Sequence, residues 1–173
     1  MNLSVLITPQ LRLSEVETLG LLDTLEHLLQ EHQTLLFILQ EEKRLIVEGK
    51  IEGLLSRVSE KEAVMRRIAG LEQERIGMTD RLEGQKERPS LKTLILHVVP
   101  IYRAKLNGLR KKLEVLTTSI TEINQMNGIL VERVLTQISD LFTLLSHLTS
   151  DGETYQGSGK MSKQLMSRTI SRG

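Results

Sequence analysis

Histidines and a glycine-rich stretch are the first places where this sequence could carry chemistry. The four histidines are His27, His32, His97 and His147. His27 and His32 lie five residues apart, so they would not share a helical face as an i, i+4 metal pair does. The stretch GSGK at residues 157–160 ends like a phosphate-binding loop, but that loop requires Gly at the place of Thr154 and Ser or Thr at the place of Met161. We therefore predict no catalytic centre, no metal site and no cofactor, and we expect that the protein is not an enzyme.

Composition excludes several further classes of protein. The chain has no Cys, which rules out disulfides and thiolate zinc sites and suits a reducing compartment, so we expect a cytoplasmic location. Its 23 basic and 22 acidic residues nearly cancel, and only 2% of residues are aromatic, which argues against nucleic-acid binding. No stretch approaches the ~18 apolar residues of a membrane span, so we expect no stable membrane insertion. The chain is rich in helix-forming residues and has only 3 Pro, a composition typical of long helices.

The first half of the chain predicts two amphipathic helices. Apolar residues recur at helical spacing from Ser14 to Glu48, and Ser14 with Glu17 forms a capping-box pattern at the start. Gly49 is the expected break between the helices. A second helix follows from Ile51 to about Arg81, and the charged stretch at residues 83–90 is the expected loop.

Residues 106–148 carry the strongest pattern, a seven-residue repeat. One series, termed position a, is Leu106, Leu113, Ile120, Asn127, Val134, Leu141 and Leu148, and the other, position d, is Leu109, Leu116, Ile123, Leu130, Gln137 and Leu144. This seam predicts a helix of roughly 60 Å. Residues 90–150 form either one helix kinked near Pro100 or two helices. The expected fold is all-α: an elongated antiparallel helical bundle or coiled coil of three long helices over residues 1–150.

Residues 151–173 predict a flexible basic tail. The stretch DGETYQGSGK is rich in Gly and small polar residues and is typical of a flexible linker. The residues after it could form a short amphipathic helix that orders only against a partner. Its apolar side, which we predict to contact that partner, consists of Met161, Leu165, Met166 and Ile170.

Asn127 occupies a position a in the seam between Ile120 and Val134. A buried polar residue there would cost stability but penalise wrong registers, so we interpret Asn127 as a specificity device. The alternative is that the seam is locally open and Asn127 is solvated.

Four blocks of the sequence resemble the FlgN family of flagellar export chaperones. EINQMNGIL, residues 122–130, is similar to the family segment with two Asn three residues apart, here Asn124 and Asn127. The segments LLQEHQTLLFILQEEKRLIVEGK and IEGLLSRVSEKEAVMRRIAGLEQER resemble the family's first two helices, and TYQGSGKMS resembles its tail motif. Two positions depart from the family pattern: Lys50 often has Asp in its place, and Gln156 often has Gly.

The resemblance implies a cytoplasmic chaperone that binds the hook-associated proteins FlgK and FlgL and delivers them to the flagellar type III export gate. It also implies that Tyr155 docks at the gate protein FlhA. Composition and periodicity leave other classes open. One is a structural homo-oligomeric coiled coil, and a weaker one is a peripheral membrane protein anchored by its tail.

Overall fold

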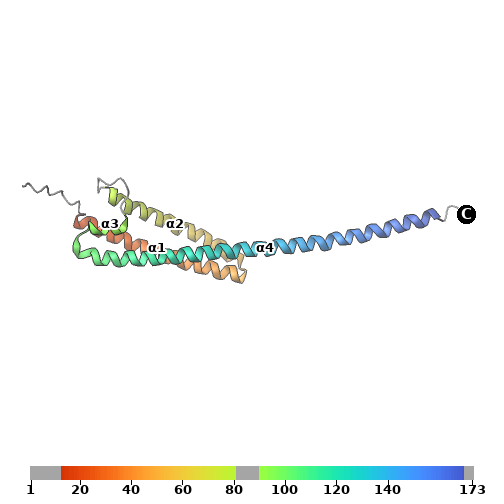
Figure 1. Cartoon of the computed structure of the whole chain (residues 1–173), viewed down its shortest axis with the longest axis horizontal. Helices are drawn as coiled ribbons and strands as arrows, with labels where there is room; N and C mark the ends of the chain where they lie inside the picture. Colours follow the sequence, from red (N-terminus) through yellow and green to blue (C-terminus); the bar gives the residue numbers. More distant parts are fainter. Residues whose placement is uncertain (1–12, 81–89, 170–173) are drawn as a thin grey trace, which may run out of the picture. The chain divides into compact units, whose positions relative to one another are not determined.

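The structure is a computed structural model that describes residues 13–80 and 90–169, with side chains placed for residues 13–78 and 90–148. Within these ranges the chain forms helices and no strands, as the all-α prediction requires (Figure 1). The helices are α1 (Glu15–Glu48), α2 (Ile51–Asp80), α3 (Leu91–Leu96), the 3-10 helix η1 (Pro100–Tyr102) and α4 (Arg103–Thr169). The prediction of three helices therefore omitted α3.

Local signals set both ends of α1. The Ser14 side chain accepts a hydrogen bond from the Glu17 backbone N–H at 3.2 Å, and Glu17 accepts one from the Ser14 N–H at 2.8 Å. This reciprocal pair confirms the predicted capping box. Gly49 ends the helix with φ at 67°, a left-handed conformation that Gly adopts without strain. The break predicted at Gly49 is confirmed, and α2 returns antiparallel to α1.

The stretch before α4 is not one kinked helix. The six-residue α3 ends at Leu96 with His97 as its C-cap, and Val99 is not helical, with φ at −55° and ψ at 126°. Pro100 explains the break, because its ring disfavours a helical conformation at the preceding residue and it has no N–H to donate. Because of this break, α3 packs against α1 before α4 begins.

The chain divides into two units, residues 1–128 and 129–173, which are described separately. In unit 1 a buried cluster joins α1, α3 and the start of α4; its members include Leu21, Leu25, Leu94, Val98 and Leu106. A second cluster joins α1 to α2, and half-buried Ile120 and Ile123 of α4 pack against it. Within unit 1, α4 runs parallel to α1, because Tyr102 contacts Glu15 and Asn127 contacts Leu39.

The Tyr102 contact lies at the end of unit 1 where α1 and α4 both begin. The Tyr102 hydroxyl donates a hydrogen bond to Glu15 Oε1 at 3.0 Å. This bond, followed by partial desolvation and the charge of Glu15, raises the pKa of Tyr102 above its ordinary value.

Unit 2 contains the segment that we predict to be a flexible basic tail. The backbone of α4 is helical through Thr169, so residues 151–169 lie on this helix, and their predicted flexibility stays a prediction. Helix extension is cooperative, and the good helix formers of this segment, such as Glu153, Gln156 and Lys160, offset glycines that each cost about 1 kcal/mol. The predicted domain boundary at residue 150 stays a prediction.

Candidate functional site

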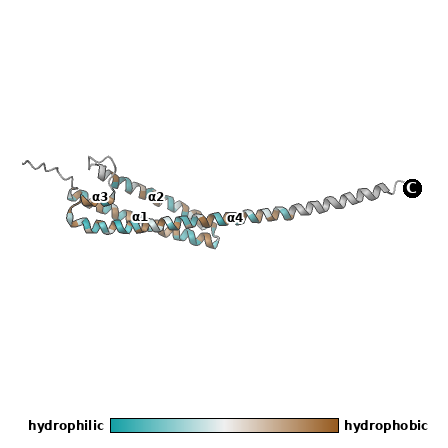
Figure 2. Ribbon diagram, viewed as in Figure 1, coloured by the Kyte–Doolittle hydropathy of each residue, from teal (hydrophilic) through white to brown (hydrophobic). Residues whose placement is uncertain are grey.

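Unit 2 exposes a large apolar surface on α4. Nine large hydrophobic side chains between residues 131 and 148 have exposed fractions of 37–65%. We call them the apolar face of unit 2: Val131, Val134, Leu135, Ile138, Leu141, Phe142, Leu144, Leu145 and Leu148. Figure 2 shows brown, hydrophobic segments alternating with teal ones along α4 up to the part drawn in grey. Exposed apolar surface of this extent is typical of a binding site.

The heptad explains which residues form this face. It includes positions a and d, as in the seam of unit 1, and adds position e at Val131, Ile138 and Leu145 and position b at Leu135 and Phe142. The remaining positions c, f and g hold mostly polar residues, among them Glu132, Ser139 and Asp140. The helix of unit 2 is therefore amphipathic, with an apolar face wider than a coiled-coil seam.

The same b and e positions are polar in unit 1. They are Asn107, Arg110, Glu114, Thr117, Thr121 and Asn124. Most of them line a groove of unit 1 that consists of two open pockets sharing Thr121, with residues of α1, α2 and α4 in both pockets. The b and e positions of α4 thus change from polar to apolar after Gly128. The sequence contains this change, but a seam defined by positions a and d alone does not include it.

Three hydroxyl groups of unit 2 form hydrogen bonds within their own helix. The hydroxyls of Thr136, Thr143 and Ser146 each donate to the carbonyl four residues earlier, at 3.0, 3.0 and 2.9 Å. Such bonds are ordinary for Ser and Thr in helices. Among residues 129–148, where the side chains of unit 2 are placed, these bonds suggest no catalytic arrangement, and the apolar face is the main feature.

Unit 1 contains a polar cluster formed by the buried Glu42 and Asn127 and the half-buried Lys61. Glu42 is 3% exposed, and Lys61 Nζ lies 2.7 Å from its Oε1. Asn127 is 5% exposed and donates from Nδ2 to the Leu39 carbonyl at 2.9 Å and to Glu42 Oε2 at 3.5 Å. The alternative that Asn127 is merely solvated is therefore wrong. Polar contacts in an apolar seam suit a residue that fixes the register of α4 against α1.

The other predicted site residues are not brought together with this cluster. Asn124 is exposed on α4 and lines the groove near Met65. Tyr155, Met161, Leu165 and Met166 lie on the helical backbone of α4, but their side chains are outside the described residues, as is all of Ile170. Their predicted roles stay predictions.

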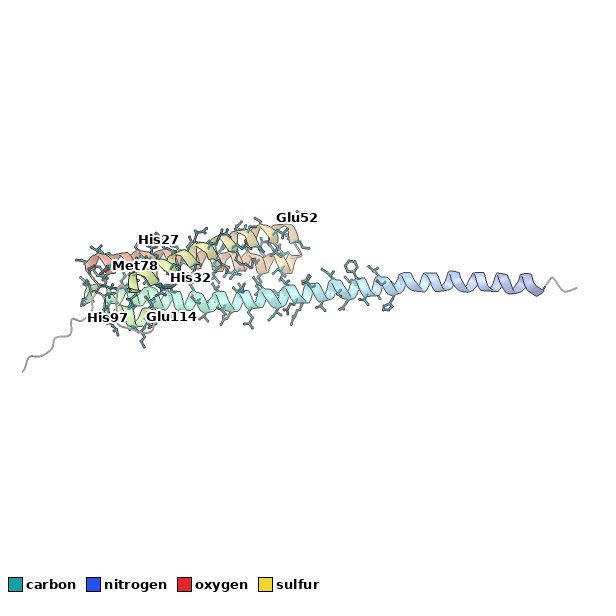
Figure 3. All side chains as sticks on the ribbon, turned by 90° about the horizontal axis from the view of Figure 1, so that it is seen from above. His27, His32, Glu52, Met78, His97 and Glu114 are labelled. Carbon is teal, nitrogen blue, oxygen red and sulfur yellow. The ribbon has the colours of Figure 1, made fainter. Side chains whose placement is uncertain are left out.

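Histidines do not converge in the part of the chain that the structure describes. His32 Nδ1 lies 2.7 Å from the carbonyl of Leu28 in its own helix, and His27 Nδ1 lies 3.4 Å from Asp23. Figure 3 shows His97 at the end of unit 1 where α4 begins, and Glu52 at the opposite end of the α1–α2 hairpin. Over the described ranges no group of three or more His, Asp or Glu side chains is placed to hold a metal ion. None of the helices in those ranges has the length and apolar character needed to cross a membrane.

Comparison with known proteins identifies the family. A family model described as FlgN protein matches residues 19–163. A search of curated proteins found no match, and a search of solved structures found none. The family match spans most of α1, all of α2 and most of α4, including the apolar face of unit 2. Because it covers well over half of the chain, the protein belongs to the FlgN family.

Proposed function

We propose that this protein is a cytoplasmic flagellar export chaperone that binds the hook-associated proteins FlgK and FlgL, prevents their premature assembly and delivers them to the type III export gate. Family membership supports a flagellar chaperone role. The observation that carries the proposal is the apolar face of unit 2, which leaves nine large hydrophobic side chains in contact with water. A client helix that buries this face would lose its own exposed apolar stripe at the same time.

Client release follows from the same physics. A segment that folds when it binds loses conformational entropy at that moment, which offsets much of the free energy gained from apolar burial. The client can therefore be covered along its length and still dissociate at the gate. Holding and release of this kind need no enzymatic step, and we propose that the protein is not an enzyme.

Delivery is assigned to the end of α4. We propose that Tyr155 docks at FlhA and that Met161, Leu165, Met166 and Ile170 extend the surface that holds the client. The support is their sequence pattern, in which these apolar residues are accompanied by Lys160, Lys163, Arg168 and Arg172.

Co-expression with FlgK or FlgL followed by gel filtration tests the proposal. The wild-type chain should co-elute with at least one of them, and Leu141→Asp should abolish co-elution by placing a charge in the apolar face. Ser139→Asp is the matched control, because it adds the same charge on the polar side two residues away, where both side chains are exposed in the free protein. Neither variant should change the melting temperature.

Two results would contradict the proposal. One is the absence of co-elution with both clients. The other is that Leu141→Asp leaves client binding intact while it dissociates a homo-oligomer of the chain, which would favour the structural coiled-coil class instead.

A further inference from the structure

The apolar face of unit 2 is wide as well as long. Positions a, b, d and e together span about 160° of the helix circumference, whereas a two-stranded coiled coil uses positions a and d alone. Phe142 at position b is 65% exposed, as much as any residue at position a. A single partner helix along positions a and d would leave the b side of the face in water.

In unit 1, residues of two helices pack against the apolar seam of α4. There the a and d residues Ile120 and Ile123 pack against a cluster that combines Leu39 of α1 with Val64 of α2. Two helices thus cover a seam whose neighbouring b and e positions are polar and line a groove. The same seam continues in unit 2 with apolar b and e positions, so its cover must be at least as wide.

From this continuity with the packing of unit 1, and resting on the proposed chaperone function, we propose that the apolar face of unit 2 binds two helical segments of one client side by side. One segment lies along positions a and d, at Leu141 and Leu144. The other lies along positions e and b, at Ile138 and Phe142. The partner chemistry is an amphipathic helical pair, comparable to the α1–α2 hairpin that packs on α4 in unit 1.

A second copy of this chain fits the surface less well. Two parallel or antiparallel copies of residues 129–148 would pair their a and d positions and leave Leu135 and Phe142 exposed on both chains. That arrangement does not account for the change from polar to apolar residues at position b after Gly128.

Site-specific cross-linking tests the proposal directly, because the chain has no Cys of its own. Single-cysteine variants Phe142→Cys and Leu144→Cys carry a short photoactivatable cross-linker on opposite flanks of the face. Each is combined with FlgK or FlgL, whichever co-elutes with the wild-type chain, and the cross-linked client peptides are identified by mass spectrometry. Thr136→Cys, at position c on the side of the helix opposite the apolar face, is the control and should give no client cross-link.

We expect Phe142→Cys and Leu144→Cys to label two client segments that are separate in the client sequence. Phe142→Ala should also weaken client affinity by about tenfold or more without changing the melting temperature of the free protein. Labelling of one and the same client segment from both positions would overturn the two-segment proposal and leave the chaperone function standing. Cross-links to a second copy, or to nothing despite co-elution, would overturn it as well. Failure of the proposed function itself is seen earlier, as absence of co-elution.

Discussion

Replacing Lys61 with Met should destabilise the protein far more than the loss of an ordinary surface charge. The Lys61 ammonium is the cation that the structure places against the buried carboxylate of Glu42, at 2.7 Å. Met retains most of the aliphatic length of Lys but removes the charge. Glu42, whose side chain is 4% exposed, would then keep a negative charge in an apolar seam with only the weaker contact from Asn127 at 3.5 Å.

The size of the effect follows from the burial of the two partners. Removing one partner of a fully buried ion pair costs about 3–5 kcal/mol. The Lys61 side chain is 24% exposed, so water can partly replace it, and we expect a loss of about 2–3 kcal/mol in the free energy of unfolding. For a chain of this size that loss lowers the melting temperature by about 4–12 °C.

The assay is thermal and urea unfolding followed by circular dichroism, with Lys105→Met as the control. Lys105 pairs with Glu26 across α4 and α1 at the same 2.7 Å, but its side chain is 57% exposed and that of Glu26 is 40% exposed. Exposed pairs contribute about 0–1 kcal/mol. A second change, Glu42→Gln, should recover most of the stability lost in Lys61→Met because it removes the buried charge.

Equal losses in Lys61→Met and Lys105→Met would refute the reasoning, since burial would then have no influence on the cost. The reasoning would also be refuted if the double variant Lys61→Met, Glu42→Gln were as unstable as Lys61→Met alone. In that case the aliphatic packing of Lys61, and not its charge, would account for the effect.

Four further predictions concern single sites or segments. Asn127→Leu should raise the melting temperature and make the oligomeric state less uniform by gel filtration, because it removes a buried Oδ1 that accepts no hydrogen bond within the described residues; a clear loss of stability would contradict the register role. Tyr155→Ala should preserve folding and client binding but weaken the affinity for the cytoplasmic domain of FlhA in a titration, and unchanged affinity would remove the assignment. Deletion of residues 160–173 should weaken client affinity by about one to three powers of ten, while the melting temperature of unit 1 stays unchanged. Tighter binding after the deletion would mean that the segment masks the client surface. Equal affinity would mean that the segment neither holds the client nor masks the surface. In the Tyr155→Phe variant the one remaining phenol, Tyr102, should ionise above the ordinary tyrosine range in an absorbance titration, and Glu15→Gln should abolish that shift. Because the folded-state pKa is raised, the stabilisation from this bond should be present at neutral pH and disappear as the pH rises through that pKa.

Local sequence was sufficient for the elements whose causes are local. Ser14 and Glu17 cap α1 through backbone groups three residues apart, and Gly49 ends it through its own φ angle. Pro100 was less decisive: the sequence left open whether residues 90–150 form one kinked helix or two, and the structure shows α3 and α4 as separate helices. The family was also readable from the sequence, since the segments with two Asn and the first two helices lie within the matched region. These features need no knowledge of what packs against them.

Two features depended on the tertiary structure. Glu42 and Lys61 look like ordinary charges on amphipathic helices. Only the packing of α2 and α4 on α1 buries Glu42 with Asn127 and places half-buried Lys61 against it. Leu106 and Leu141 occupy the same heptad position, yet Leu106 is fully buried and Leu141 is 60% exposed. Periodicity states which side of a helix is apolar, because side-chain direction follows from the helical turn. Whether that side is covered depends on the other segments of the fold. In unit 1, α1 and α3 cover Leu106, whereas in unit 2 the apolar face stays exposed and open to a partner.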